Sequence, residues 1–289
     1  MTTHVRRGIG TPLQVKEETL TDTLEKTKSI PKVVLWAVPR SISTAFFRAM
    51  MNKKNVKVML EPYARAYYYG NERVSTRYGD QPITENCSFE DIKGEYEDDV
   101  QDMEAVFAKD MAYYLTNNLE SVACLPNGYL HTFMIRDPRK SIKSLYRMSI
   151  KKELTGWDSF DPSEAGFVEL FKLYQLAVNE LGQEPIIVDA DDLIQHPEGI
   201  LKAYCAKTGI EFDPMMLNWE HNKPDMEIFK EWLPWFENAM TSKSFQSSGP
   251  SAKRPRKADQ DELPSEVKAC IEDCMPYYKK MFAKRLHPL

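Results

Sequence analysis

The 289-residue chain lacks any apolar run long enough to span a bilayer. Its first 29 residues, MTTHVRRGIGTPLQVKEETLTDTLEKTKS, are polar and contain no segment that resembles a signal peptide. Basic residues are not in excess, because 38 Lys and Arg against 43 Asp and Glu give a net charge of −5. This balance excludes attraction of nucleic acid or an anionic membrane by the charge of the whole molecule. We therefore expect a cytoplasmic protein in which any anion site is local.

Cysteines are few and show no paired pattern. Cys270 and Cys274 lie four residues apart in a predicted helix, and no histidine or second cysteine pair nearby completes a zinc site. We therefore expect structural thiols in a reducing compartment and no bound metal. The five cysteines are Cys87, Cys124, Cys205, Cys270 and Cys274.

Glycine is absent between residues 32 and 51, so this stretch contains no GxxxxGK[ST] nucleotide-binding loop. The absence argues against an ordinary ATP or GTP hydrolase. The stretch, KVVLWAVPRSISTAFFRAMM, nevertheless places an arginine and small hydroxyl residues between a predicted buried strand and a predicted helix.

Predicted strands alternate with predicted helices, which is typical of an α/β fold with a parallel sheet of about five strands covered by helices. Residues 1–30 are interpreted as a polar extension and residues 31–289 as one domain. Residues 63–102 are expected to form a long loop across the mouth of a site. We expect strands at 32–38, 56–61, 104–110, 129–135 and 185–194, and helices at 44–52, 111–120, 140–150, 163–183, 197–210 and 263–282.

The first strand is followed by Arg40, Ser41, Ser43 and Thr44, where the next helix begins. In a parallel sheet, ligands bind at the carboxyl ends of the strands, and a helix N-terminus there attracts anions. The forked guanidinium of Arg40 suits phosphate or sulfonate oxygens. The hydroxyl side chains therefore either cap the helix or contact an anionic ligand, and both interpretations stay open.

A second strand-to-helix junction, IRDPRKSIKSLYRM at residues 135–148, repeats this pattern. Arg136 ends the strand and Ser144 follows eight residues later on the helix, so the two side chains are placed to hold a second phosphate. Alternatively, Arg136 pairs locally with Asp137 and the serine faces solvent.

Together, the two junctions resemble the signatures of the P-loop sulfotransferases, which use 3′-phosphoadenosine 5′-phosphosulfate (PAPS) and release 3′-phosphoadenosine 5′-phosphate (PAP). PRSIST is similar to the family's PKSGTTW or PRSGTT loop, and RDP followed by Ser144 is similar to its second signature. The segments 188–214 and 263–282 are similar to later parts of the family. The resemblance spans residues 32–282 and implies the sulfotransferase type of the P-loop nucleoside-triphosphate-hydrolase fold. It assigns cofactor binding to Arg40, Ser41, Ile42, Ser43, Thr44, Arg136 and Ser144.

The chain departs from the family pattern at several positions. Ile42 stands where most relatives have glycine, which predicts an altered loop backbone. Ala45 replaces the tryptophan that often packs against adenine. The loop that binds the 3′-phosphate in many relatives has only loose counterparts here, which are Lys243, Ser244, Lys253 and Arg254.

The resemblance points to Glu61 as the catalytic base. Met111 stands where many relatives carry a histidine on the third strand, whereas Glu61 follows Arg40 by 21 residues, as the catalytic glutamate does in protein-tyrosine sulfotransferases. Those enzymes also have arginine in the loop. Alternatively, Glu61 pairs with Arg65 or caps the following turn.

Residues near Glu61 receive supporting roles. Lys109 is a candidate for stabilising charge and Asp110 for a second base, whereas His131 is interpreted as a core residue. The tyrosines after Glu61 are expected either to form an aromatic wall for the acceptor or to belong to the core. The candidate acceptor residues are Tyr63, Tyr67, Tyr68 and Asp110, and further pocket or support residues are Trp219, Phe229, Trp232, Trp235 and Phe236.

These observations predict transfer of a sulfuryl group from PAPS to a hydroxyl of a small aromatic or hydrophobic acceptor by in-line displacement. Arg40 is expected to stabilise the leaving phosphate, and a base assists the acceptor. No nucleic acid, membrane or metal partner is expected, and a homodimer stays open. The alternatives are a P-loop kinase that uses ATP and Mg²⁺ and a catalytically inactive nucleotide-binding module.

Overall fold

The computed structural model describes residues 1, 30–219, 226–245 and 262–289. Most of the predicted N-terminal extension lies outside these ranges, as do the loose 3′-phosphate candidates Lys253 and Arg254. Within the described residues, one sheet and its covering helices share a continuous core.

Five parallel strands form the sheet in the order β2-β3-β1-β4-β5, which confirms the predicted fold class. The central strands are apolar on both faces because helices cover both faces. Every residue of β3 is buried, and in β1 only the first residue, Lys32, is not. The strands are β1 (Lys32–Ala37), β2 (Val56–Leu60), β3 (Ala105–Met111), β4 (Leu130–Ile135) and β5 (Ile186–Asp189).

The fifth strand is shorter than the predicted 185–194. The Asp189 carboxylate accepts hydrogen bonds from the N–H groups of Asp191 and Asp192, and this cap starts helix α7 (Ala190–Gln195) directly after the strand. The acidic run that follows the apolar residues therefore belongs to a helix N-terminus.

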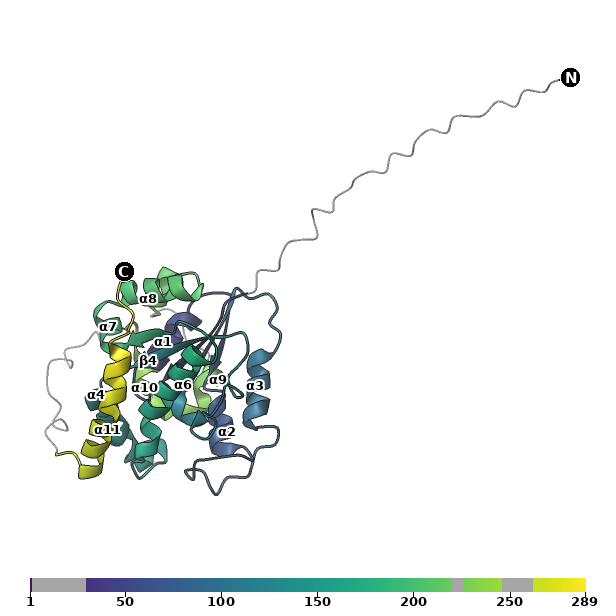
Figure 1. Ribbon diagram of the computed structural model, residues 1–289. Coiled ribbons are helices and arrows are strands. Elements are labelled where there is room, and N and C mark those ends of the chain that lie inside the picture. The colour runs from purple at the N-terminus through teal and green to yellow at the C-terminus, as the bar shows by residue number, and fades with distance from the viewer. Residues whose placement is uncertain (2–29, 220–225, 246–261) are drawn as a thin grey trace.

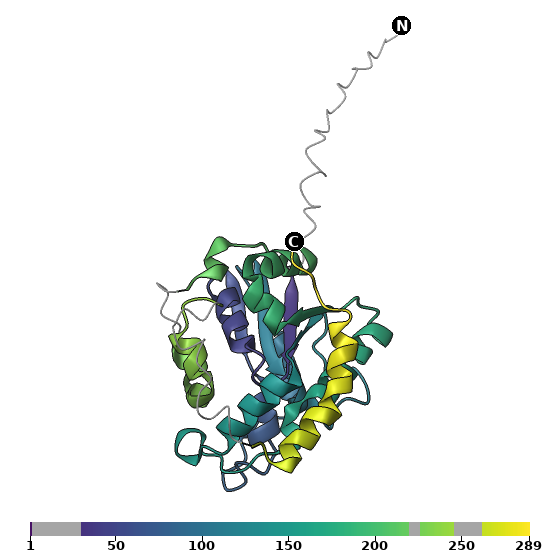
Figure 2. The ribbon, with the colours of Figure 1, turned by 90° about the vertical axis from the view of Figure 1, so that its left-hand side faces the viewer.

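Helices pack on both faces of the sheet (Figures 1 and 2). On one face α1 contacts β2 and β3, with α10 packed against it, and on the other α6 and α11 contact β4. Figure 2 shows α10 in light green and α11 in yellow on opposite sides of the strands. No helix in the described ranges combines the length and apolarity needed to cross a membrane. Besides α7 and two helices in the segment 63–102, the helices are α1 (Ser43–Met51), α4 (Pro138–Ser149), α5 (Lys152–Thr155), α6 (Phe167–Asn179), α8 (Pro197–Thr208), α9 (Met226–Phe229), α10 (Leu233–Thr241) and α11 (Ser265–Phe282). The 3₁₀ turns are η1 (Ala112–Leu115), η2 (Pro162–Ala165), η3 (Pro214–Leu217) and η4 (Lys230–Trp232).

The segment 63–102 is more ordered than the long loop predicted for it. It contains α2 (Tyr63–Tyr69) and α3 (Phe89–Glu97). A reciprocal pair of hydrogen bonds between Ser88 and Asp91 begins α3. The helix predicted at 111–120 is also wrong, because Met111 ends β3 and η1 is a single turn.

The cysteines and His131 lie away from any cluster of metal ligands in the described residues, and most of them are buried. All five cysteines are free thiols, and Cys270 and Cys274 are buried on α11. His131 is buried in β4 as predicted, and its Nδ1 accepts a hydrogen bond from Trp36 Nε1 at 2.9 Å. Burial lowers the pKa of His131 to about 4, so its imidazole is neutral at physiological pH.

Candidate active site

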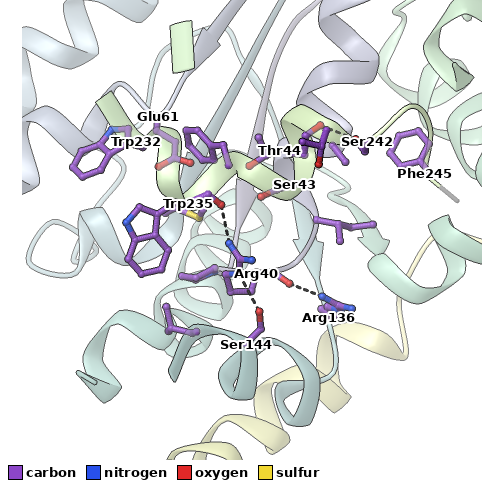
Figure 3. Close-up of a pocket in the computed structure, with 18 of the residues that line it drawn as sticks. Arg40, Ser43, Thr44, Glu61, Arg136, Ser144, Trp232, Trp235, Ser242 and Phe245 are labelled. Atoms are coloured by element: carbon purple, nitrogen blue, oxygen red, sulfur yellow. Dashed lines mark hydrogen bonds between the residues drawn. The ribbon is translucent and has the colours of Figure 1, made fainter. Parts of the chain in front are cut away.

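A cavity of about 690 Å³ opens where β1, β2, β3 and β4 end (Figure 3). Its walls come from the loop after β1, the end of β3 with η1, the β4–α4 junction and the segment from η4 to residue 245. Both predicted phosphate junctions therefore face one cavity at the carboxyl edge of the sheet, the position where parallel α/β folds bind ligands.

Arg40 joins the two junctions. Its Nε donates to Ser144 Oγ at 3.1 Å, and its Nη1 donates to the Trp235 carbonyl oxygen at 2.8 Å, as Figure 3 shows. Burial, helped by the neighbouring Arg136, lowers the pKa of Arg40 to about 10, so the guanidinium keeps its charge at neutral pH. A guanidinium has five N–H donors, so these two bonds leave donors for an anionic ligand.

The loop after β1 holds two residues in left-handed backbone conformations. Arg40 has φ 62° and Ile42 has φ 64°, and neither is glycine. A β-branched residue rarely adopts this conformation. Ile42 thus adopts the left-handed conformation for which glycine is suited, and the altered loop backbone stays a prediction.

The hydroxyl residues of this loop have different positions. Ser41 is fully buried, donates to the Val38 carbonyl oxygen at 2.7 Å and does not line the cavity. Ser43 and Thr44 do line it, and no side chain caps α1. The structure thus moves Ser41 from the candidate ligand residues to the support of the loop.

Arg136 carries an unsatisfied donor. Its Nη1 donates to the Arg40 carbonyl oxygen at 2.9 Å, but its buried Nε–H has no partner among the described residues. The local pair with Asp137 is not formed, because that carboxylate binds Arg139 instead. An unpaired buried donor costs about 1–3 kcal/mol, so Arg136 is prepared for an acceptor from a ligand.

The segment after α10 supplies the side of the cavity where the 3′-phosphate candidates lie. Lys243 and Ser244 both line the cavity. Backbone contacts hold this segment, since Trp219 N–H donates to the Lys243 carbonyl oxygen at 3.0 Å and Asn218 forms a bridge with Ser244. Ala45 also lines the cavity.

Glu61 lies at the cavity in a small, buried polar cluster. Its carboxylate is held by Lys109 Nζ and by the hydroxyl of Tyr114, the latter at 2.7 Å. Glu61 is 5% exposed and Lys109 is fully buried. The alternative pair with Arg65 is wrong, because that guanidinium binds Glu95. Lys109 does not line the cavity, so it acts on Glu61 rather than on a ligand directly.

An aromatic wall continues from Glu61 along the cavity. Tyr68, Trp157, Trp232 and Trp235 line it, and Trp157 and Trp235 pack with ring centroids 4.5 Å apart. Figure 3 shows Trp232 and Trp235 on the same side as Glu61. Phe236, Tyr113 and Tyr114 complete this wall.

Three predicted acceptor residues do not reach the cavity. Tyr63 and Tyr67 are buried, because α2 turns these side chains toward the core. Asp110 accepts bonds from the Tyr63 N–H at 2.9 Å and the Tyr96 hydroxyl at 2.8 Å. Burial raises the pKa of Asp110 to about 7, but its partners place it in the support of β3 and α2. Trp219 and Phe229 likewise do not line the cavity.

Sequence patterns missed Tyr113, Tyr114 and Trp157. The two tyrosines lie just after β3. Their position at the carboxyl end of a parallel strand could have identified them as residues of the site. Trp157 comes after the short helix α5 and carried no motif.

Comparison with known proteins identifies the family. Residues 31–285 match the family model described as the sulfotransferase domain. The chain is 26% identical over 248 residues to branched-chain-amino-acid aminotransferase-like protein 2 of Arabidopsis thaliana, which covers 84% of this chain and 40% of that protein. It is 30% identical over 151 residues to sulfotransferase ppzF of Metarhizium majus (strain ARSEF 297), which covers 46% of this chain and 43% of that protein. The chain thus spans about two fifths of the length of these curated relatives.

Among solved structures, the sulfotransferase domain from the curacin biosynthetic pathway superposes with a TM-score of 0.49 at 14% sequence identity, covering 90% of this chain and 99% of that chain. The family model, in contrast, matches the sequence itself from the start of β1 to beyond the end of α11. The chain belongs to the sulfotransferase family.

Proposed function

We propose that the protein transfers a sulfuryl group from PAPS to a hydroxyl of a small aromatic or hydrophobic acceptor. The observation that carries this proposal is the convergence of Arg40, Ser144 and Glu61 on one cavity, with the first two in hydrogen-bond contact at 3.1 Å. Membership of the sulfotransferase family supports the class of reaction.

The residues of the cavity fit an adenosine bisphosphate. Arg136 offers a buried donor without a partner among the described residues, and helix α1 begins at the cavity wall. We assign Arg40, Ser43 and Thr44 to the 5′ end of the nucleotide, and Arg136 and Ser144 to the 3′ end. When bound, PAPS supplies the sulfuryl group.

Glu61 is the proposed base. Its carboxylate faces the cavity beside the aromatic wall, where it accepts the proton of the acceptor hydroxyl. The buried ammonium of Lys109 balances the carboxylate charge, and Arg40 stabilises the charge that develops on the departing phosphate oxygen. Trp232 and Trp235 hold an apolar acceptor and exclude water.

Binding is tested by thermal unfolding with PAP and, separately, with ATP and Mg²⁺. PAP at one hundred times its Kd adds about 2.7 kcal/mol to the unfolding free energy, whereas ATP–Mg²⁺ adds much less. Arg40→Ala reduces the PAP effect. Arg139→Ala is the matched control, since this arginine is largely exposed and bound to Asp137. A larger effect of ATP–Mg²⁺ than of PAP would favour the kinase alternative.

Turnover is tested by transfer of radiolabelled sulfate from PAPS to a panel of phenols and alcohols. Glu61→Gln removes at least 99% of kcat while the PAP-dependent shift in unfolding stays at the wild-type level. Full activity of Glu61→Gln over the pH range contradicts the assignment of the base. PAP binding without transfer by the wild type to any metabolite, monitored as the mass gain of one SO₃, supports the inactive-module alternative.

We propose that the enzyme is cytoplasmic and that it binds the nucleotide and a small hydroxyl acceptor. It does not bind nucleic acid or a membrane in this proposal, and whether it forms a homodimer stays open. The acidic net charge of −5 and the apolar wall of the cavity support these assignments.

A further inference from the structure

Glu61 is held by one neighbouring stretch of chain at three points. Its backbone N–H donates to the Lys109 carbonyl oxygen at 2.7 Å, Lys109 Nζ binds Oε1, and the Tyr114 hydroxyl donates to Oε2 at 2.7 Å. Lys109 lies in β3 and Tyr114 in the turn that follows, so both come from 105–115. The backbone of Glu61 is left-handed, with φ 52°, and these bonds hold it there.

Tyr114 is itself fixed by its surroundings. It is 3% exposed, and its ring packs against Tyr67, Tyr68 and Tyr113 with centroids 5.3, 5.7 and 4.5 Å away. Burial and the nearby Glu61 carboxylate raise the pKa of Tyr114 well above its usual value, so the phenol stays a donor at neutral pH. A rigid donor therefore lies at one of the two oxygens of Glu61.

We propose that Tyr114 is the positioning residue of the base: its hydroxyl fixes the Glu61 carboxylate so that the lone pair it leaves unused faces the acceptor hydroxyl. This inference rests on the proposed function. A glutamate side chain loses rotamer entropy when it is fixed, and the bonds from Tyr114 and Lys109 fix Glu61 in the folded enzyme before the acceptor binds.

The charged and titratable groups around Glu61 define what the phenol contributes. In the described residues they include Lys109 and Asp110 from β3 and Tyr113 and Tyr114 from η1. Lys109 supplies charge to Oε1 and Tyr114 supplies the neutral donor to Oε2. Removing the phenol hydroxyl therefore leaves the ion pair intact and frees one carboxylate oxygen.

The test is Tyr114→Phe, which deletes only that hydroxyl. We expect kcat to fall about tenfold, with the KM for PAPS and the PAP-dependent shift in unfolding unchanged. The matched control is Tyr129→Phe, which removes a buried tyrosine hydroxyl bonded to the Tyr96 carbonyl oxygen, away from the cavity. Wild-type kcat in a folded Tyr114→Phe enzyme overturns the inference.

A second measurement separates this inference from the proposed function. Isotope-edited infrared spectra of ¹³C-glutamate protein, with the Glu61 band identified by its loss in Glu61→Gln, report the hydrogen bonds of that carboxylate without turnover. We expect the Glu61 band to shift in Tyr114→Phe and to stay in place in Tyr129→Phe. An unshifted band in Tyr114→Phe rejects the role of Tyr114, whereas absence of sulfate transfer by the wild type rejects only the proposed function.

Discussion

At Ile42, an isoleucine occupies a backbone conformation that costs L-residues about 1–2 kcal/mol. It stands between Arg40, also left-handed, and the first residue of α1. The conformation turns the chain so that helix α1 starts at the cavity. We infer that the cost is met by the loop's fixed ends, including the Ser41 bond to the Val38 carbonyl oxygen.

This strain predicts that, at residue 42, the glycine variant is more stable to unfolding than the alanine variant. Ile42→Gly should be more stable than Ile42→Ala by about 1 kcal/mol, because alanine keeps the left-handed cost and glycine additionally loses only the contacts of one Cβ atom. Three residues later, inside α1, Ala45→Gly should be less stable than the wild type by about 1 kcal/mol. Urea unfolding measures both differences, and an Ile42→Ala protein at least as stable as Ile42→Gly contradicts the strain argument.

At the scale of elements, helix α1 supports two sides of the cavity. Its N-terminus carries Thr44, and one turn later the buried Arg48 donates from Nη1 to the carbonyl oxygens of Ala239, Met240 and Ser242 at 2.5, 3.1 and 3.0 Å. These carbonyls lie at the end of α10 and at the start of the segment after it, which lines the cavity. Arg48 therefore fixes the distance between the loop after β1 and the opposite wall.

Arg48→Met keeps the aliphatic stem but leaves three partly buried carbonyl groups without their donor. We expect a loss of about 2–3 kcal/mol in unfolding free energy and about tenfold weaker PAP binding, because the wall formed by residues 242–244 shifts. Arg65→Met is the matched control: this arginine forms a half-exposed pair with Glu95, worth less than about 1 kcal/mol. Urea unfolding and calorimetric PAP titration check both effects, and equal losses in the two variants would falsify the role of Arg48.

At the scale of the whole molecule, His131 links stability to pH. Burial lowers its pKa from 6.5 to about 4, so between these values the unfolded chain binds a proton that the folded protein does not. The contribution is complete above pH 6.5 and is lost as the pH falls toward 4. It amounts to about 3 kcal/mol of unfolding free energy.

His131→Asn removes the titrating imidazole but keeps an acceptor for Trp36 Nε1. The unfolding free energy of the wild type should fall more steeply between pH 6.5 and 4 than that of the variant, by up to about 3 kcal/mol over the interval. Replacement of the exposed His196 is the matched control. Parallel curves for wild type and His131→Asn show that the histidine does not couple folding to protonation.

Much of this architecture could be predicted from the sequence. Continuous apolar runs followed by helical periodicity located the strands, and the rule that parallel strands end at one edge brought Arg40 and Ser144 together although 104 residues separate them. Glu61 at the end of the second strand followed from the same rule. These predictions depend on element order, which periodicity encodes well.

The orientation of individual side chains could not be predicted. Tyr63 and Tyr67 differ from Tyr68 only in their rotation about the short helix α2, which depends on packing against β3 and η1. The Ser41 side chain points into the protein because its hydroxyl donates a hydrogen bond to the Val38 carbonyl oxygen. Tyr114 follows a strand whose end lay one residue beyond the predicted boundary.

The strand order has a consequence for how the protein is made. β1 is synthesised first but lies in the middle of the sheet, and its neighbours β3 and β4 begin at residues 105 and 130. The hydrogen bond from Arg40 to the Trp235 carbonyl oxygen can form only after another 195 residues have been synthesised. During translation the loop after β1 therefore emerges from the ribosome long before the walls that enclose it, and a nascent chain stopped before residue 230 has the loop but not a finished pocket.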